Sequence, residues 1–112
     1  MKKIEAFIRH EAFEPIRIDL LELGFPSLSI SEVKGSGRQK GIVETYRGAE
    51  YQIDFVPKVR LQIVTDDDRV DDIVSCITNA AATGKIGDGK IWVTEVDRVI
   101  RIRTGDEGSD AI

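Results

Sequence analysis

The chain has 112 residues, and a chain of this length suits a single domain with one hydrophobic core. Hydrophobic residues make up 41% and charged residues 32%, a globular composition that argues against a disordered protein. The formal net charge of −4 argues against a surface that attracts nucleic acid as a whole.

The first part of the chain predicts a strand, a helix and a second strand. Apolar and polar residues alternate over residues 3–9, as in a half-buried strand. A helix is expected over residues 15–23, because Pro15 suits a first helical turn and Gly24 suits a helix end. Residues 28–34 are predicted to form the second strand.

The second part begins with a predicted strand over residues 59–64 and continues with the clearest helix. Asp66-Asp67-Asp68 suits the start of this helix, because carboxylates can cap its free N–H groups and complement its dipole. Apolar residues then recur at the spacing of one helical face between residues 70 and 81, and Gly84 is expected to end the helix.

Two further strand segments and a tail complete the chain. Residues 91–96 are predicted to form a strand, residues 99–102 a short extension, and residues 105–112 a polar, mobile tail. The order βαββαβ predicts an α+β, ferredoxin-like fold, with the helices on one face of an antiparallel sheet. Many unrelated functions use this fold, so it does not identify the function.

A long connection separates the second and third strands, which a short hairpin loop could join. It spans roughly twenty residues, from about 35 to 57, and connections of this length are usually functional or disordered. Its sequence includes Gly35-Ser36-Gly37-Arg38-Gln39-Lys40-Gly41 and Tyr46-Arg47-Gly48-Ala49-Glu50-Tyr51. This mixture of glycine, charge and tyrosine favours an exposed recognition element.

A glycine-rich segment precedes the last strand: Gly84-Lys85-Ile86-Gly87-Asp88-Gly89-Lys90, which matches G-x-x-x-x-G-K. Glycines let backbone N–H groups approach phosphate oxygens, and a lysine supplies positive charge. However, Ile91 stands where a P-loop has Ser or Thr, and a strand follows where a P-loop has a helix. The segment is therefore not a Walker-type ATPase loop; the motif alone leaves open a phosphate-binding turn or a plain glycine-rich turn.

Two other segments have side chains suited to an anionic ligand. Arg101-Ile102-Arg103 would project both arginines from one face of a strand and could hold a polyphosphate, or it could be an edge strand protected by charge. In Arg38-Gln39-Lys40-Gly41, the Gln39 side chain offers a neutral oxygen that could ligate magnesium, or the segment could be a flexible polar loop.

No catalytic set of side chains is recognisable. The single histidine, His10, is expected to be a surface or capping residue, and the single cysteine, Cys76, a small packing residue inside a helix. Phe7 and Trp92 are candidates for core or interface aromatics, and the aromatic strand motif of RNA-recognition domains is missing. No apolar run approaches the roughly 20 residues that span a bilayer, and no signal peptide is recognisable, so a cytoplasmic protein is expected.

The same segments resemble the PII nitrogen-regulatory signal-transduction protein family. Residues 35–54 resemble the T-loop of PII proteins, residues 83–90 their B-loop, and residues 99–105 their C-terminal segment. The resemblance covers essentially the whole chain, with the motifs in the family's order. It implies a single signalling domain over residues 1–112, with the T-loop at 35–57, the B-loop at 83–90 and the C-loop and tail at 101–112.

The resemblance implies a homotrimer whose ATP and ADP sites lie between neighbouring subunits, with Mg²⁺ and 2-oxoglutarate as further effectors. The implied nucleotide-binding residues are Phe7, Ser29, Gly35, Gly37, Arg38, Gln39, Val64, Gly87, Asp88, Gly89, Lys90, Arg101 and Arg103. The implied 2-oxoglutarate-binding residues are Gln39, Lys40, Gly41, Lys58 and Gly87, with Gln39 also a metal ligand. Tyr51 matches the tyrosine that is uridylylated or adenylylated in the family.

The resemblance also implies partners for the T-loop. They would be regulated proteins such as an ammonium-transport channel, a nitrogen-assimilation enzyme or its modifying enzyme. Nucleic acid is not expected, and a membrane is expected only indirectly, through a transporter. The chain departs from the common family pattern at Arg9-His10, where Lys-Pro is frequent, and at Ser29 and Gln62, where Thr and Glu are frequent.

Two alternatives belong to other functional classes. A PII-like sensor of a different small molecule would share the fold, but the intact Gln39 and Lys58 argue against it. A weak ATPase would use the glycine-rich segment, but the missing Ser or Thr and the missing catalytic base argue against that reading. A regulatory protein without enzymatic activity is therefore expected.

Overall fold

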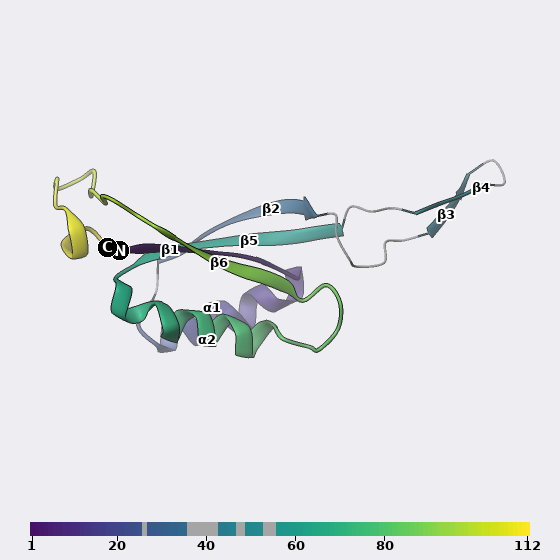
Figure 1. Cartoon of the computed structure of the whole chain (residues 1–112), viewed down its shortest axis with the longest axis horizontal. Coiled ribbons are helices and arrows are strands. Elements are labelled where there is room, and N and C mark those ends of the chain that lie inside the picture. The colour runs from purple at the N-terminus through teal and green to yellow at the C-terminus, as the bar shows by residue number, and fades with distance from the viewer. Residues whose placement is uncertain (26, 36–42, 47–48, 53–55) are drawn as a thin grey trace.

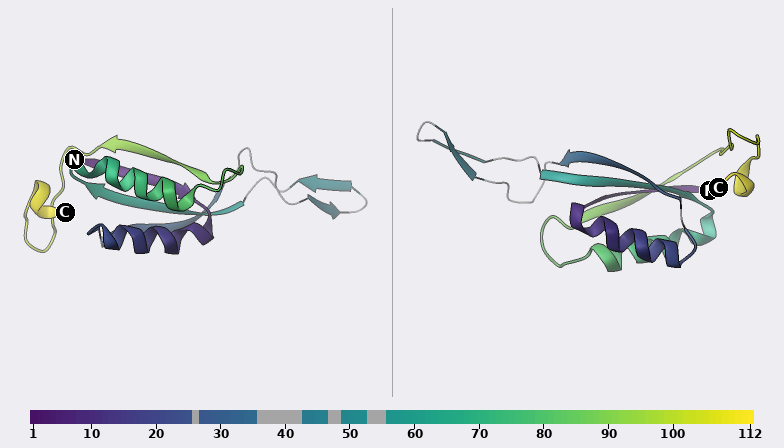
Figure 2. Two further views of the ribbon diagram at one scale, coloured as in Figure 1. Left: turned by 90° about the horizontal axis from the view of Figure 1, so that it is seen from below. Right: turned by 180° about the vertical axis from the view of Figure 1, so that it is seen from behind.

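A four-stranded antiparallel sheet with both helices on one face forms the body of the protein (Figures 1 and 2). The structure is a computed structural model that describes residues 1–112 except 26, 36–42, 47–48 and 53–55. The sheet strands are β1 (Lys2–Ile8), β2 (Ser29–Gly35), β5 (Val56–Thr65) and β6 (Gly89–Glu95), in the order β2-β5-β1-β6. The helices are α1 (Phe13–Glu22) and α2 (Val70–Ala81). The predicted α+β, ferredoxin-like arrangement is confirmed.

The core lies between the sheet and the helices. On β1 the alternating residues Ile4, Ala6 and Ile8 are fully buried, as the period of two requires for one face of a strand. Their register partners on β5 are Ile63, Leu61 and Val59, which are also buried because paired residues share a face. The helices contribute four fully buried side chains, namely Ile16 and Leu20 from α1 and Ile73 and Ile77 from α2.

The strand boundaries differ from the sequence prediction by one to three residues, and β5 and β6 begin earlier than predicted because pairing extends their ladders. The largest change is in β5, which was expected over residues 59–64 and is Val56–Thr65. Its early residues pair with the end of β2, where Gly35 lies opposite Val56. Similarly, β6 begins at Gly89 rather than at residue 91, because Gly89 pairs with Ile8 of β1.

The helix starts are also corrected. Each α-helix follows a short 3₁₀ turn, η1 (His10–Ala12) before α1 and η2 (Asp67–Arg69) before α2. The predicted capping of α2 by Asp66-Asp67-Asp68 is wrong, because no side chain caps η2 or α2. The Asp67 carboxylate instead pairs with the α-amino group of Met1 at 2.8 Å. The last helical residue is Ala81, so the helix ends before Gly84, which lies in the following turn with φ +80°.

The long connection between β2 and β5 contains a hairpin of its own. Strands β3 (Val43–Tyr46) and β4 (Ala49–Gln52) form a separate two-stranded antiparallel sheet, with Val43 opposite Gln52. Since Gly35 and Val56 belong to the main sheet, the inserted segment is residues 36–55.

The C-terminal segment differs from the expected strand and mobile tail. Residues 99–102 form only an isolated bridge, between Ile100 and Glu107. A turn follows, closed by the hydrogen bond from the Gly105 N–H to the Arg101 carbonyl at 2.7 Å. The tail then forms the 3₁₀ helix η3 (Gly108–Ala111), at the end of the sheet where the N-terminus also lies (Figure 1).

Candidate functional site

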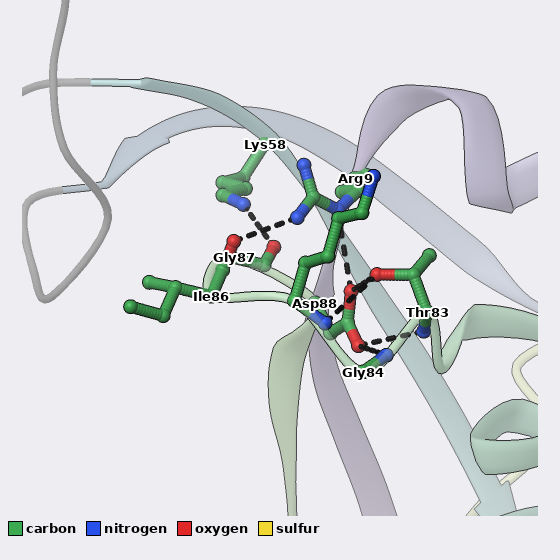
Figure 3. Close-up of polar contacts among 8 residues, drawn as sticks. Arg9, Lys58, Thr83, Gly84, Ile86, Gly87 and Asp88 are labelled. Atoms are coloured by element: carbon green, nitrogen blue, oxygen red, sulfur yellow. Dashed lines mark hydrogen bonds and ion pairs between the residues drawn. The ribbon is translucent and has the colours of Figure 1, made fainter.

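The connection from α2 to β6, residues 82–88, is organised around the carboxylate of Asp88 (Figure 3). This carboxylate accepts hydrogen bonds from the backbone N–H groups of Thr83 at 2.7 Å and Gly84 at 3.0 Å, and from the Thr83 hydroxyl. The Thr83 hydroxyl, together with the backbone donors and Arg9, lowers the pKa of Asp88 from 3.8 to about 2. Asp88 is thus ionised at neutral pH and folds the loop back on itself.

Glycine is required where this loop enters β6. Gly89 has φ +104°, and a Cβ atom at this position would lie 1.8 Å from the carbonyl oxygen of Phe7. Gly87 has φ +102°, which also favours glycine. The loop backbone can therefore lie directly against β1.

Two cations hold the other side of the loop. Arg9 donates from Nη2 to the Ile86 carbonyl at 2.7 Å and lies 3.4 Å from Asp88 Oδ1 through Nε. Lys58 donates from Nζ to the Gly87 carbonyl at 2.5 Å. Figure 3 shows both side chains beside the loop, Lys58 from β5 and Arg9 from the residue that follows β1. Burial lowers the pKa of Lys58, and the neighbouring Arg9 charge lowers it further.

Sequence reasoning missed this role of Arg9, which it noted only as a departure from the family pattern. The signal that could have found it is strand register. Ile8 of β1 pairs with Val59 of β5, so Arg9 and Lys58 flank one paired position at the same end of the sheet. Sequence spacing alone does not show that register.

Most of the other predicted nucleotide-binding residues that are described gather at this end of the sheet. Phe7 lies opposite Lys90 in the β1–β6 ladder, and its ring contacts that of Trp92 edge-on, with centroids 5.0 Å apart. A cavity of about 340 Å³ lies between α2 and β6. Its lining includes Phe7, Asp88, Gly89 and Lys90 together with apolar side chains of α2. We refer to this end, including Gly35, Lys58 and Gly87, as the B-loop end.

A second group of predicted residues lies at the other end of the sheet. Ser29, Val64 and Arg101 line a separate cavity of about 610 Å³. Ser29 and Gly35 are the two ends of the seven-residue strand β2, which at roughly 3.3 Å per residue places them about 20 Å apart. We refer to this second group as the C-loop end. The structure therefore divides the predicted nucleotide-binding residues that it describes between two distant places on one protomer.

The expected geometry of Arg101 and Arg103 is corrected. Neither lies on a strand, so the argument that alternation places both guanidinium groups on one face does not apply. Arg101 is half-buried and pairs with Asp106 Oδ2 at 3.3 Å, and Thr104 donates to the same oxygen at 2.8 Å. Arg103 is exposed in the turn.

Several predicted residues lie outside the described part of the chain, namely Gly37, Arg38, Gln39, Lys40 and Gly41. Tyr51 lies in β4, where the structure describes the backbone path.

Cys76 is buried in α2, as expected of a packing residue, and His10 is exposed. No helix in the described ranges is long and apolar enough to cross a membrane.

Comparison with known proteins decides the family. The family model for nitrogen regulatory protein P-II matches residues 1–106. The chain belongs to the PII family. It is 54% identical to the nitrogen regulatory protein P-II of Pasteurella multocida and 55% identical to the nitrogen regulatory protein P-II 1 of Escherichia coli K12. Both alignments cover 112 residues and the full length of each chain. The resemblance of the chain to the PII family is thereby confirmed.

Membership in the PII family identifies the general role of the chain. The relatives are named as nitrogen regulatory proteins, and the alignments cover their whole length. Its role is therefore PII-type signalling.

Proposed function

We propose that this PII protein senses ATP, ADP and 2-oxoglutarate at sites between the subunits of a homotrimer and signals through its T-loop. The observation that supports the shared site is the division of the predicted nucleotide-binding residues between the B-loop end and the C-loop end. These ends are about 20 Å apart on a protomer, which is too far for one triphosphate to contact both the glycine-rich turn and Arg101. A neighbouring subunit would supply the missing half.

The B-loop end supports phosphate binding on chemical grounds. Gly87 and Gly89 keep the backbone near β1, and Lys90 supplies a charge, so this turn would hold the phosphates. Arg101 and Arg103 of the adjacent subunit would add charge-assisted hydrogen bonds. Arg38 and Gln39 would complete the site, with the Gln39 side-chain oxygen as a magnesium ligand. When bound, magnesium would neutralise part of the charge on the phosphates and on a neighbouring dicarboxylate.

The exposed face of the sheet supports assembly into a trimer. Figure 1 shows both helices on one face, whereas no described helix or strand covers the other. Phe7 and Trp92 lie on that open face, and both are half-buried in the protomer. Burying aromatic surface of this kind against other subunits would stabilise the assembly.

Lys58 supports 2-oxoglutarate binding. Its ammonium group is half-buried and donates to the Gly87 carbonyl. A carboxylate is a stronger acceptor than a neutral carbonyl for a charged donor, so a dicarboxylate could replace this contact. Gln39, Lys40, Gly41 and the backbone of Gly87 would hold the rest of the ligand. Gln39 belongs to the T-loop, so ligand binding would change the T-loop conformation and the choice of partner.

The T-loop, residues 35–57, would bind the regulated proteins. These would be of the kinds expected from the resemblance, including an ammonium-transport channel and a nitrogen-assimilation enzyme. Tyr51 would be the site of nucleotidylation. Residues 1–112 would act as one signalling domain of the cytoplasm, with the B-loop at 83–90 and the C-loop and tail at 101–112.

Subunit complementation tests the shared site. Lys90→Ala and Arg103→Ala are prepared separately and then co-assembled by co-expression with two different affinity tags. Each variant alone is expected to bind ATP at least about tenfold more weakly. The mixed trimer should regain tight sites, because one interface combines the intact Lys90 of one subunit with the intact Arg103 of its neighbour. Absence of any regain would mean that a single protomer supplies both residues.

Calorimetry tests the identity of the effectors. ATP and ADP should each bind to the wild-type trimer, and 2-oxoglutarate should bind with ATP and magnesium present. If nucleotide binds but 2-oxoglutarate does not, the chain senses a different small molecule.

A further inference from the structure

The cavity at the C-loop end has one wall made by the C-terminal residues. Ala111 and Ile112 line this cavity of about 610 Å³ together with Ser29, Val64 and Arg101. Its volume is within the range of small-molecule sites, roughly 300–1,000 Å³. The wall comes from a segment that is more than forty residues beyond β5 in sequence and yet lies beside its end.

One side-chain contact ties this wall to the body of the protein. The Ser109 hydroxyl, in η3, donates a hydrogen bond of 2.6 Å to Oδ1 of Asp66, the residue that follows β5. Because the acceptor is a carboxylate, this hydrogen bond is of the stronger, charge-assisted kind. A backbone hydrogen bond from Gly108 to the Val99 carbonyl, at 3.1 Å, holds the start of η3. Ser109 therefore fixes the last turn, and with it Ala111 and Ile112.

The lining of the cavity suits a nucleobase better than a phosphate. Leu28, Val64, Val99 and Ile112 offer apolar surface, and the Ser29 hydroxyl offers a polar group. A purine has flat apolar faces and a polar edge, which matches this combination. Two cations, Lys3 and Arg101, also line the cavity, and each is paired with a carboxylate, that of Glu5 at 2.7 Å and that of Asp106 at 3.3 Å.

We infer that Ser109 and Asp66 are positioning residues that hold Ala111 and Ile112 as one wall of the base-binding part of the nucleotide site. This inference rests on the proposed nucleotide binding, in which the base lies at the C-loop end and the phosphates at the B-loop end of the adjacent subunit; it adds the role of the Ser109–Asp66 contact. The Ser109–Asp66 hydrogen bond acts only through the wall and touches no phosphate.

The test compares ATP with inorganic tripolyphosphate, which has the phosphates but no base. In Ser109→Ala, affinity for ATP should fall by about fivefold or more, since a hydrogen bond to a charged group is lost. Affinity for tripolyphosphate should stay within about twofold of the wild type, because a substitution at the C-loop end should hardly affect a distant phosphate site. Ser109→Thr retains the hydroxyl and should bind both ligands as the wild type does. Ser75→Ala, an exposed serine on α2, is the matched control.

The outcomes separate the inference from the proposed function. Equal ATP affinity in Ser109→Ala and the wild type would overturn the inference alone. Equal weakening of ATP and tripolyphosphate would also overturn it, because it would indicate general damage to the trimer. If the wild type binds neither ligand, the proposed nucleotide binding itself fails. A double variant, Ser109→Ala with Asp66→Asn, should be no weaker than the weaker single variant, because the two side chains form one contact.

Discussion

Gly89 and Phe7 lie so close that the start of β6 has no room for a side chain against β1. A Cβ atom on residue 89 would be 1.8 Å from the Phe7 carbonyl oxygen and 2.8 Å from its carbonyl carbon. Both atoms belong to the backbone, so the neighbour cannot rotate away. This contact places the glycine-rich turn directly beside the sheet.

Gly89→Ala should strongly destabilise the protein. The combination of a backbone clash and φ +104° should lower the free energy of unfolding by about 3 kcal/mol or more. Gly84→Ala is the matched control, because Gly84 also has positive φ, +80°, but has open space around its Cβ position. Gly84→Ala should lower the free energy of unfolding by only about 1 kcal/mol. Urea denaturation of both variants measures the difference, and equal costs would contradict the close contact.

The Asp88 carboxylate should make stability depend on pH in the acid range. Its pKa in the folded protein is about 2, below the usual 3.8, so folding favours the ionised form. The stabilisation is therefore fully present above about pH 5 and disappears as the pH falls through 4 to about 2. The stability gap between the wild type and Asp88→Asn should narrow over that window in denaturation experiments.

The matched control for this titration is Asp97→Asn. Asp97 is exposed and takes part in none of the described side-chain hydrogen bonds or ion pairs. A direct check is the carboxyl NMR titration of Asp88. A midpoint near 4 would show that the loop hydrogen bonds do not favour the ionised form.

Lys58→Met should abolish binding of 2-oxoglutarate and leave ATP binding nearly unchanged. The substitution removes the cation proposed to bind a carboxylate of 2-oxoglutarate but keeps a side chain of similar length. Calorimetry with ATP and magnesium present measures both ligands. Lys34→Met, an exposed position near the same end of the sheet, is the control and should keep the response. Retained 2-oxoglutarate binding in Lys58→Met would move the site elsewhere.

Binding of 2-oxoglutarate should require both ATP and magnesium. A dicarboxylate beside a triphosphate is repelled, and a divalent cation that contacts both reverses the sign of the interaction. ADP lacks the terminal phosphate and should support binding poorly. Titrations with ATP, with ADP and with a chelator measure this order. Equal affinity in all three conditions would rule out a metal-bridged site.

Lys90→Ala and Arg103→Ala should each weaken ATP binding about tenfold or more, because each loses a charge-assisted contact with phosphate. Lys85→Ala tests whether the effect is specific, since Lys85 is an exposed cation in the same loop without a proposed role. Isothermal titration measures the dissociation constants. Similar losses in all three variants would indicate a diffuse effect of charge instead of a defined phosphate site.

The regular part of this fold follows from sequence periodicity. The alternation at Ile4, Ala6 and Ile8 predicts β1, and the spacing from Ile73 to Ile77 predicts α2, because burial of one face imposes those periods. The same rule fails at Ile100 and Ile102, where apolar residues alternate without a core to bury them. Ile102 is fully exposed, so the alternation there reflects no strand.

The sequence predicts the glycine-rich turn of the candidate site but not the side-chain contacts that hold the site in place. The motif around Gly87 and Gly89 is local, so sequence reveals it. The contacts of Arg9 with Ile86 and of Ser109 with Asp66 join segments that are distant in sequence. Such contacts depend on strand register and on the path of the C-terminal segment, which no local pattern records.

The hydrogen bond from Lys58 to Gly87 has a thermodynamic consequence for the proposed sensor. The same lysine would bind the dicarboxylate, and the same glycine belongs to the phosphate-binding turn. Exchange of one contact for the other therefore links the two equilibria in a closed cycle. If the nucleotide changes the dissociation constant of 2-oxoglutarate by some factor, 2-oxoglutarate must change the dissociation constant of the nucleotide by the same factor. The protein would then respond to the ATP/ADP ratio and the concentration of 2-oxoglutarate jointly, and to neither independently of the other.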